Sequence, residues 1–571
     1  MASYYVENFG CRVTQADGAA LERQFEERGL ARASTAAQAD VVILNSCTVT
    51  TAADQDARAA VRRVRRQNPN SKIIVTGCYA QRAPEEIAAL PGVACVVGNS
   101  HKHQLAEIAL CGRPDARDRE GCDFFGNELA SDAEIGDDLE FCGASSTVKN
   151  DLEFGSTSDT ATNDFGRRSA SSAAKNAALL ERALALEGSA FVPLTTLTAR
   201  APSPIFVSDI FAHTELLAAP VFDAAGSHEN ERTRPNLKVQ DGCDNRCSFC
   251  VIPYVRGQSR SLRLDEIIRE VNTLVEAGYR EVVISGINLG RWGRDLNGSR
   301  QPATGSRNSD LAFPVAGSRK PEATFEDLIR VILGETALEK LRISSVEPMD
   351  WSDELIALVA ESPRIAKHAH VPLQSGSDAV LRRMHRKYRP WHYREKIEKI
   401  RAAMPIAAIG ADVMTGFPGE THAEFEATRR LIEELPFTYL HVFTYSARPG
   451  TPAANMRDQV PVHIARERNR ILRDLGAEKK QAFMRGFIGQ TVEAITLSSA
   501  CSLSSRAASV DLLANQSGAV EGPPVLAATI FTEALTDNYL KLHLTGQHDA
   551  NRWLRARVED VVDGALTGTV R

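Results

Sequence analysis

The strongest constraint on the fold is a repeated alternation of short apolar runs with helical patterns, which occurs in two separate parts of the chain. The first part precedes residue 112. Its apolar runs lie at 3–9, 40–46, 72–77 and 94–99, and helical patterns such as 18–30 and 56–67 lie between them. Parallel strands need long crossover connections, which are usually helices. This alternation therefore predicts an α/β domain with a doubly wound parallel sheet.

The second alternation begins near residue 236 and contains about six strand–helix units. Its expected strands are 237–242, 281–286, 341–346, 368–374, 407–417 and 439–446. This pattern predicts a partial barrel of the TIM type, (βα)6, with its active site at the carboxyl ends of the strands. A long basic helix is expected at 462–485. About five short strands follow it and predict a small β-barrel.

These patterns divide the chain into an N-terminal domain at 1–112, an insertion and linker at 113–228, a central barrel at 229–484 and a C-terminal β-barrel at 485–571. The insertion is polar and acidic and has few apolar residues for a core, so we expect much of it to be disordered. Two further insertions are expected at about 296–322 and 498–525. Cys122 and Cys142 lie in the first insertion and receive no role.

The charge balance of the chain is uneven. The formal net charge is −6, but residues 120–165 contribute −11, from twelve acidic residues and Lys149. The rest of the chain therefore carries about +5, which is compatible with binding RNA. No apolar run is long enough to cross a membrane, and the first residues do not resemble a secretory signal. Eleven cysteines in a chain expected to be cytoplasmic indicate metal or redox chemistry rather than disulfides.

Three cysteines of the N-terminal domain occupy equivalent positions. Cys11, Cys47 and Cys78 each follow an expected strand directly, and a helical pattern follows each of them. In a parallel sheet these positions share the carboxyl edge, where open α/β sheets bind ligands. We therefore expect the three thiols to converge on a common ligand. The alternative is three unrelated buried cysteines.

The segment "DGCDNRCSFCVIPY" places Cys243, Cys247 and Cys250 in a loop after the first strand of the barrel. Three closely spaced thiolates can hold an iron–sulfur cluster and leave one iron without a protein ligand. A zinc site is the alternative, but zinc usually takes a fourth Cys or His nearby, and none follows before His368. The spacing resembles that of the radical SAM superfamily. In that superfamily the open iron binds S-adenosylmethionine, which is split to give a 5′-deoxyadenosyl radical.

Further motifs extend this resemblance over nearly the whole chain apart from the insertions. They are "NFGCRVTQAD", "LNSCTVT", "VTGCYAQ", "SSVEP", "PLQSGSD", "MTGFPGET" and "YSARPGTPAA". Together they resemble the methylthiotransferases, most closely the MtaB-like branch that acts on N6-threonylcarbamoyladenosine in tRNA. Thr14 and Ser46 depart from the family pattern, which usually has Asn and Thr there. Neither is expected to touch a cluster ligand.

The resemblance implies two 4Fe–4S clusters, one on Cys11, Cys47 and Cys78 and the other on Cys243, Cys247 and Cys250. It also implies S-adenosylmethionine as cofactor, and the C-terminal barrel is similar to the RNA-binding TRAM domain. Residues at strand ends or beside the cluster loop are candidate cofactor contacts: Phe249, Ser285, Asn288, Glu347 and Gln374. Asp412 is expected to be a buried, hydrogen-bonded residue. Arg256 and Arg260 could meet RNA phosphates or form ordinary ion pairs, and the sequence leaves both interpretations open.

The resulting hypothesis is methylthiolation of N6-threonylcarbamoyladenosine at C2, next to the tRNA anticodon. The expected partners are the anticodon stem-loop, a reductase or flavodoxin-type electron donor, and a sulfur donor. Rival substrates are isopentenyladenosine in tRNA and an aspartate of a ribosomal protein. A non-catalytic iron–sulfur protein for RNA binding or electron transfer is the alternative from a different class. Such a protein would not need an open cluster site in a barrel.

Overall fold

The structure of the chain is a computed structural model that describes residues 2–111, 203–213, 216, 233–296, 323–497 and 531–571. The expected insertions at 113–205, 296–322 and 498–525 lie almost entirely outside the described residues, and so do Cys122 and Cys142. The described residues fall into one compact unit that includes the N-terminal sheet, the central barrel and the C-terminal strands.

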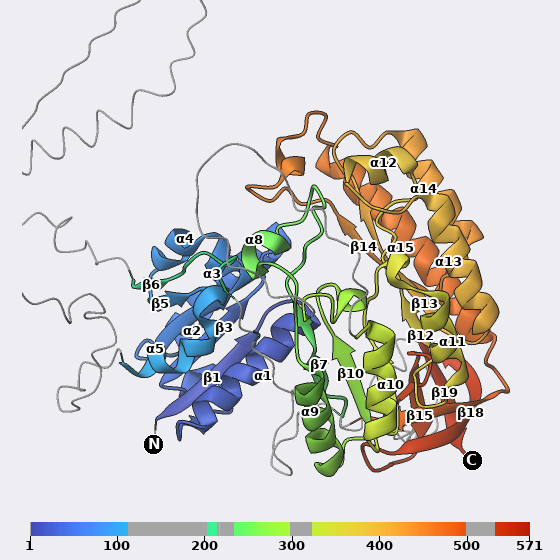
Figure 1. Cartoon of the computed structure of the whole chain (residues 1–571), viewed down its shortest axis with the longest axis horizontal. Helices are drawn as coiled ribbons and strands as arrows, with labels where there is room; N and C mark the ends of the chain where they lie inside the picture. The colour runs from blue at the N-terminus through green and yellow to red at the C-terminus, as the bar shows by residue number, and fades with distance from the viewer. Residues whose placement is uncertain (1, 112–202, 214–215, 217–232, 297–322, 498–530) are drawn as a thin grey trace, which may run out of the picture. The chain divides into compact units, whose positions relative to one another are not determined.

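The N-terminal part is a parallel sheet with the strand order β2-β1-β3-β4-β5-β6. Its strands are β1 (Ser3–Asn8), β2 (Ala31–Arg32), β3 (Val41–Ser46), β4 (Lys72–Gly77), β5 (Val93–Val97) and β6 (Ile205–Phe206). Its helices are α1 (Arg12–Glu26), α2 (Thr51–Gln67), α3 (Cys78–Arg82), α4 (Pro84–Ala88) and α5 (Leu105–Cys111) (Figure 1). All six residues of β3 are buried, as expected for a strand covered on both faces. The predicted doubly wound sheet is confirmed, and β6 adds residues that the sequence pattern assigned to the linker.

The central part contains two three-stranded parallel sheets, β11-β10-β7 and β12-β13-β14. Bridges from Leu341 to Ile365 and from Ser345 to His370 join them into one curved set of six strands. The strands are β7 (Asn236–Lys238), β10 (Glu281–Ser285), β11 (Lys340–Ile343), β12 (His368–His370), β13 (Ala408–Thr415) and β14 (Tyr439–Thr444). The predicted (βα)6 partial barrel is thus confirmed, with β7 and β14 as its two end strands.

Helices cover the outer face of this curved sheet (Figure 1). They are α9 (Leu264–Glu276), α10 (Phe325–Glu335), α11 (Asp353–Glu361), α12 (Asp378–Arg383), α13 (Pro390–Ala403), α14 (His422–Glu434) and α15 (Val462–Arg485). On β13, Ile409, Ala411 and Val413 belong to the same hydrophobic core as Ile397 of α13 and Phe425 of α14. Side chains alternate across a strand. Asp412, which lies between Ala411 and Val413, therefore faces the barrel interior.

The C-terminal strands form a closed barrel in the order β15-β16-β17-β19-β18. They are β15 (Thr491–Thr496), β16 (Phe531–Thr536), β17 (Lys541–Thr545), β18 (Trp553–Val562) and β19 (Ala565–Val570). The turn between β16 and β17 holds Tyr539 at φ +69°, a conformation that non-glycine residues rarely adopt. The Tyr539 hydroxyl accepts a hydrogen bond of 2.9 Å from Arg12, which directly follows Cys11. The C-terminal barrel therefore meets the start of α1 beside the central barrel.

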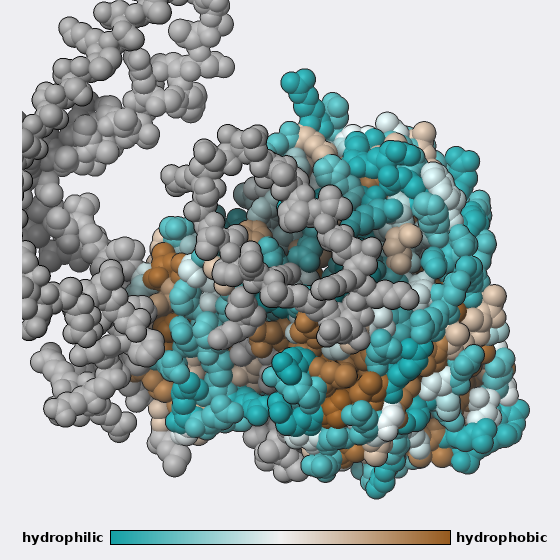
Figure 2. Space-filling model, viewed as in Figure 1, coloured by the Kyte–Doolittle hydropathy of each residue, from teal (hydrophilic) through white to brown (hydrophobic). Residues whose placement is uncertain are grey.

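The exterior agrees with this arrangement. Figure 2 shows mostly hydrophilic surface over α13 and α14, whose apolar faces are turned to the core. Among the described residues, no helix has both the length and the apolar character needed to cross a bilayer.

Candidate active site

The structure brings Cys11, Cys47 and Cys78 to one edge of the N-terminal sheet. They follow β1, β3 and β4, which are adjacent strands. Gly10, which directly precedes Cys11, packs tightly against Cys47. A Cβ atom added at Gly10 would lie only 2.6 Å from Cβ of Cys47 and 3.0 Å from its Sγ. Gly10 also has φ +119°, which favours glycine. The turn before Cys11 therefore depends on glycine in order to lie against Cys47.

Two of these thiols, those of Cys47 and Cys78, are buried, whereas Cys11 is exposed. Burial, with the neighbouring Cys78, raises the pKa of the Cys47 thiol to about 12. An amide donor, Asn99 Nδ2, lies 3.6 Å from Cys78 Sγ. Thr14 Oγ1 lies 3.5 Å from Cys11 Sγ. The expectation that Thr14 does not touch a proposed ligand was therefore wrong, because one turn of α1 carries its hydroxyl back to Cys11.

The second group of cysteines lies in the loop between β8 (Gln240–Asp241) and α8 (Ile252–Arg256). Backbone bonds from Cys243 N to Gly257 O and from Cys250 N to Cys247 O, both 3.1 Å, fold this loop back on itself. Burial raises the pKa of Cys250 to about 12 and that of Cys243 to about 11.

Arg386 is a neighbour of this loop that the sequence analysis missed. Its Nη1 lies 3.2 Å from Cys247 Sγ, its other amino group forms an ion pair with Glu347, and its side chain is buried. Glu347, an expected cofactor contact, is therefore paired with Arg386 and holds that guanidinium beside Cys247. A guanidinium at this position stabilises negative charge on Cys247. Arg386 lies in the basic segment "MHRKYRP", and nothing in that segment predicts that this arginine contacts a cysteine.

Three of the expected cofactor contacts have a buried polar atom that lacks a hydrogen-bond partner among the described residues. These atoms are Ser285 Oγ, Asn288 Oδ1 and Gln374 Oε1. Asn288 Nδ2 lies 3.7 Å from Cys243 Sγ, and Gln374 has φ +60°, an uncommon conformation that is concentrated at functional sites. Buried polar atoms are normally satisfied. This set therefore fits a polar ligand at the strand ends, such as the amine and hydroxyl groups of S-adenosylmethionine.

Phe249, the remaining expected cofactor contact, is half-buried against the central core. Its ring lies edge-on to that of Phe417, with centroids 6.4 Å apart. It therefore anchors the middle of the cysteine loop on the barrel.

The two groups of cysteines lie close to each other. Cys78 packs in one small apolar cluster with Val251 and Val255, and Val251 directly follows Cys250. Asn99 strengthens this junction because it also donates a 2.7 Å hydrogen bond to the carbonyl of Val255. The sheet edge with Cys78 thus lies directly against the loop with Cys250.

A buried network of charges holds the same junction together. Asp17 of α1 contacts Lys102, Lys238 and Arg256, and all four side chains are buried. Asp241 accepts from both Lys238 and Arg256 at 3.0–3.1 Å. Of the two roles expected for Arg256, contact with RNA phosphates or ordinary ion pairs, the structure shows ion pairs. Arg260 is also buried, and it donates to the carbonyls of His213 and Arg256.

A six-stranded parallel barrel with an open three-cysteine loop beyond its first strand defines a radical SAM enzyme. Residues 237–432 match the Radical SAM superfamily, and residues 3–98 match the Uncharacterized protein family UPF0004. The chain is 31% identical over 495 residues to "Threonylcarbamoyladenosine tRNA methylthiotransferase MtaB" of Bacillus subtilis, with 87% of this chain and 85% of that protein covered. It is 32% identical to the MtaB protein of Rickettsia prowazekii, with 86% of each chain covered.

The chain therefore belongs to the family of radical SAM tRNA methylthiotransferases. Membership implies a 4Fe–4S cluster and S-adenosylmethionine as cofactors. A second branch of the family is also similar: the chain is 29% identical to the "tRNA-2-methylthio-N(6)-dimethylallyladenosine synthase" of Erythrobacter litoralis, with 86% of each chain covered. Identities this close do not separate the two branches.

Proposed function

We propose that this enzyme adds a methylthio group to C2 of N6-threonylcarbamoyladenosine next to the tRNA anticodon. The relatives named for this substrate in Bacillus subtilis and Rickettsia prowazekii support the proposal. The chemistry of the barrel interior supports it too. Arg342, His368, His370 and Asp412 lie on β11, β12 and β13 between core residues such as Ala369, Ala411 and Val413, so this face of the barrel carries polar groups that could bind a polar N6 substituent.

The observation that carries the chemical part of the proposal is the contact of Cys78 with Val251 and Val255. This contact brings Cys78 next to the segment that directly follows Cys250. Cys243, Cys247 and Cys250 would hold the cluster that binds S-adenosylmethionine. Cys11, Cys47 and Cys78 would hold a second 4Fe–4S cluster that receives the sulfur. When bound, these groups supply the radical, the sulfur and the methyl group.

The protein's own residues orient these groups and exclude water. Arg386 stabilises negative charge on Cys247, and Glu347 holds the guanidinium in place. Asn288 and Gln374 offer their unpaired oxygens to the cofactor. The partners we propose are the anticodon stem-loop, whose bases can be splayed outward, an electron donor of the reductase or flavodoxin type, and a sulfur donor.

Paired cysteine variants test the assignment of the two clusters. Cys47→Ala should lower the iron content from roughly eight to roughly four per chain, as expected for the loss of one of two 4Fe–4S clusters. It should still cleave S-adenosylmethionine but yield no thiolated RNA. Cys247→Ala should retain the other four irons and lose cleavage. Cys95→Ala is the matched control, since Cys95 is a buried cysteine of β5 that packs in an apolar core. Full iron and thiolated RNA from Cys47→Ala would refute the second cluster.

The substrate branch is tested by mass analysis of tRNA nucleosides from cells with and without this gene. Loss of the 2-methylthio form of N6-threonylcarbamoyladenosine is the expected result. Loss of the 2-methylthio form of isopentenyladenosine instead would assign the enzyme to the other branch.

A further inference from the structure

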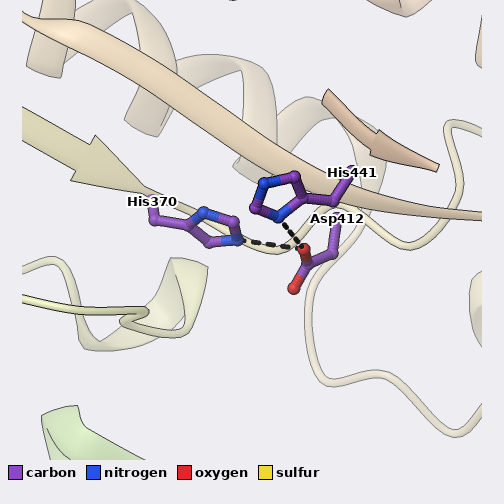
Figure 3. Close-up of side chains that lie close together, drawn as sticks. All are labelled: His370, Asp412 and His441. Atoms are coloured by element: carbon purple, nitrogen blue, oxygen red, sulfur yellow. Dashed lines mark ion pairs between the residues drawn. The ribbon is translucent and has the colours of Figure 1, made fainter. Parts of the chain in front are cut away.

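Two histidine side chains, from the strands on either side of β13, converge on a single carboxylate oxygen of Asp412. His370 Nε2 lies 3.1 Å from Asp412 Oδ1, and His441 Nδ1 lies 3.3 Å from the same atom (Figure 3). The residues come from β12, β13 and β14, and Asp412 is the register partner of His441. Tyr439 extends the cluster, since its hydroxyl lies 3.0 Å from His370 Nδ1. We call Asp412, His370, His441 and Tyr439 the imidazole–carboxylate cluster.

The cluster faces the barrel interior rather than the hydrophobic core. Asp412 alternates on β13 with Ala411 and Val413, which pack against the helices. Burial raises the pKa of Asp412, but hydrogen bonds from His370 and His441 outweigh that effect and hold the pKa below its usual range. The carboxylate is therefore charged, and it fixes the orientation of both rings. The Nε2 atom of His441 makes no hydrogen bond within the described part of the chain, and the His441 side chain is 56% exposed.

A cavity of about 420 Å³ adjoins the cluster between β14 and the C-terminal barrel. Tyr439 and His441 line it, together with Arg234, Lys480, Lys541 and Glu533. Three of these residues are cationic and one is acidic. Leu440, Leu535 and Leu542 also line the cavity, so it combines hydrogen-bonding groups and a positive balance of charge with an apolar part. It therefore suits a negatively charged organic group that also has an aliphatic portion.

We propose that the imidazole–carboxylate cluster and Arg234 form the subsite for the N6 substituent of the target adenine, a ureido group that carries a carboxylate. This inference rests on the proposed function. Asp412 and Tyr439 would meet the N–H and carbonyl groups of the urea, while His441 and Arg234 would meet the carboxylate. An aliphatic N6 substituent could make no hydrogen bond with any of these groups, so the site would favour the ureido substituent over an apolar analogue.

A metal ion is the competing occupant, because the three ligand atoms of His370, Asp412 and His441 all lie within 4.8 Å of one another. The charge of the surroundings favours the organic anion. Arg234, Lys480 and Lys541 line the adjoining cavity and would repel a cation there.

The test compares two anticodon stem-loops of the same sequence, one with N6-threonylcarbamoyladenosine and one with N6-dimethylallyladenosine. The readout is the ratio of kcat/KM for methylthiolation of the two RNAs, so that a general loss of activity cancels. The wild type should favour the threonylcarbamoyl RNA by about 100-fold or more. His441→Phe should lower this preference roughly 10- to 100-fold, as expected for the loss of a hydrogen bond to a charged group. His548→Phe is the control, since His548 lies on the C-terminal barrel and bonds the carbonyl of Thr545.

The outcomes separate the two proposals. A wild type that modifies only the dimethylallyl RNA refutes the proposed function. A wild type that prefers the threonylcarbamoyl RNA, with the same preference in His441→Phe and Asp412→Asn, refutes the subsite alone. The zinc content of the enzyme that carries its iron–sulfur clusters is measured after incubation with Zn²⁺. One zinc per chain that is lost in Asp412→Asn would overturn the subsite in favour of a metal site.

Discussion

Asp17→Asn should loosen the junction between α1 and the central barrel. Asp17 Oδ2 lies 3.0 Å from both Lys102 Nζ and Arg256 Nη2, and Lys238 contacts its other oxygen. Burial alone raises the pKa of Asp17, but the three cations outweigh it and hold that pKa below its usual range. The substitution leaves Asp241 as the remaining acid among these charges. Breaking a buried ion pair by removing one partner costs about 3–5 kcal/mol.

A chain of several domains does not unfold in one step, so a single free energy of unfolding would not report this cost. Hydrogen exchange of the α1 amides measures it locally. A loss of 3–5 kcal/mol corresponds to roughly a hundred- to a few-thousand-fold faster exchange. Glu434→Gln removes one partner of the exposed Arg394–Glu434 pair and is the control, with an expected effect below about 1 kcal/mol. Adding Lys102→Met to Asp17→Asn should recover about 0.5–3 kcal/mol, because it removes a buried cation that has lost its acidic partner. Exchange in Asp17→Asn within about fivefold of the wild type would refute this reasoning.

Gly10→Ala should lower the iron on the N-terminal cysteines, since its Cβ would clash with Cys47; Gly29→Ala, also at positive φ but with no atom within 4 Å, should keep the iron. Iron content after reconstitution decides this, and equal iron in both variants would contradict it. Arg386→Met should slow cleavage of S-adenosylmethionine and make the reduction potential of the nearby cluster more negative, because Cys247 loses a cationic donor; an unchanged potential would argue against this role. Arg555→Ala combined with Arg557→Ala, exposed positions on β18, should reduce the salt dependence of tRNA binding by about two in slope. An unchanged slope would exclude this strand from RNA contact.

The fold was largely predictable because its determinants are local. Hydrophobic runs ending at Cys11, Cys47 and Cys78 located both the strands and the shared edge of the sheet. The same logic placed Ser285 and Gln374 at strand ends, where the structure shows unpaired buried oxygens.

The parts that escaped prediction depend on long-range pairing. Arg386 meets Cys247 across 139 residues, and Asp17 meets Arg256 across 239, with no local pattern to mark either contact. β6 is two residues long and carries too weak a signal to be separated from the preceding insertion. The convergence of His370, Asp412 and His441 required the register of three strands, which side-chain periodicity alone does not fix.

The hydrogen bond between Arg12 and Tyr539 has a consequence for how the enzyme is made. The two residues are 527 positions apart in the chain. At typical synthesis rates, Cys11 leaves the ribosome roughly half a minute to two minutes before Tyr539. During that interval the N-terminal domain can fold as a unit while the neighbouring side of the central barrel lacks its last contact. The contact between α1 and the C-terminal barrel is therefore among the last to form during synthesis.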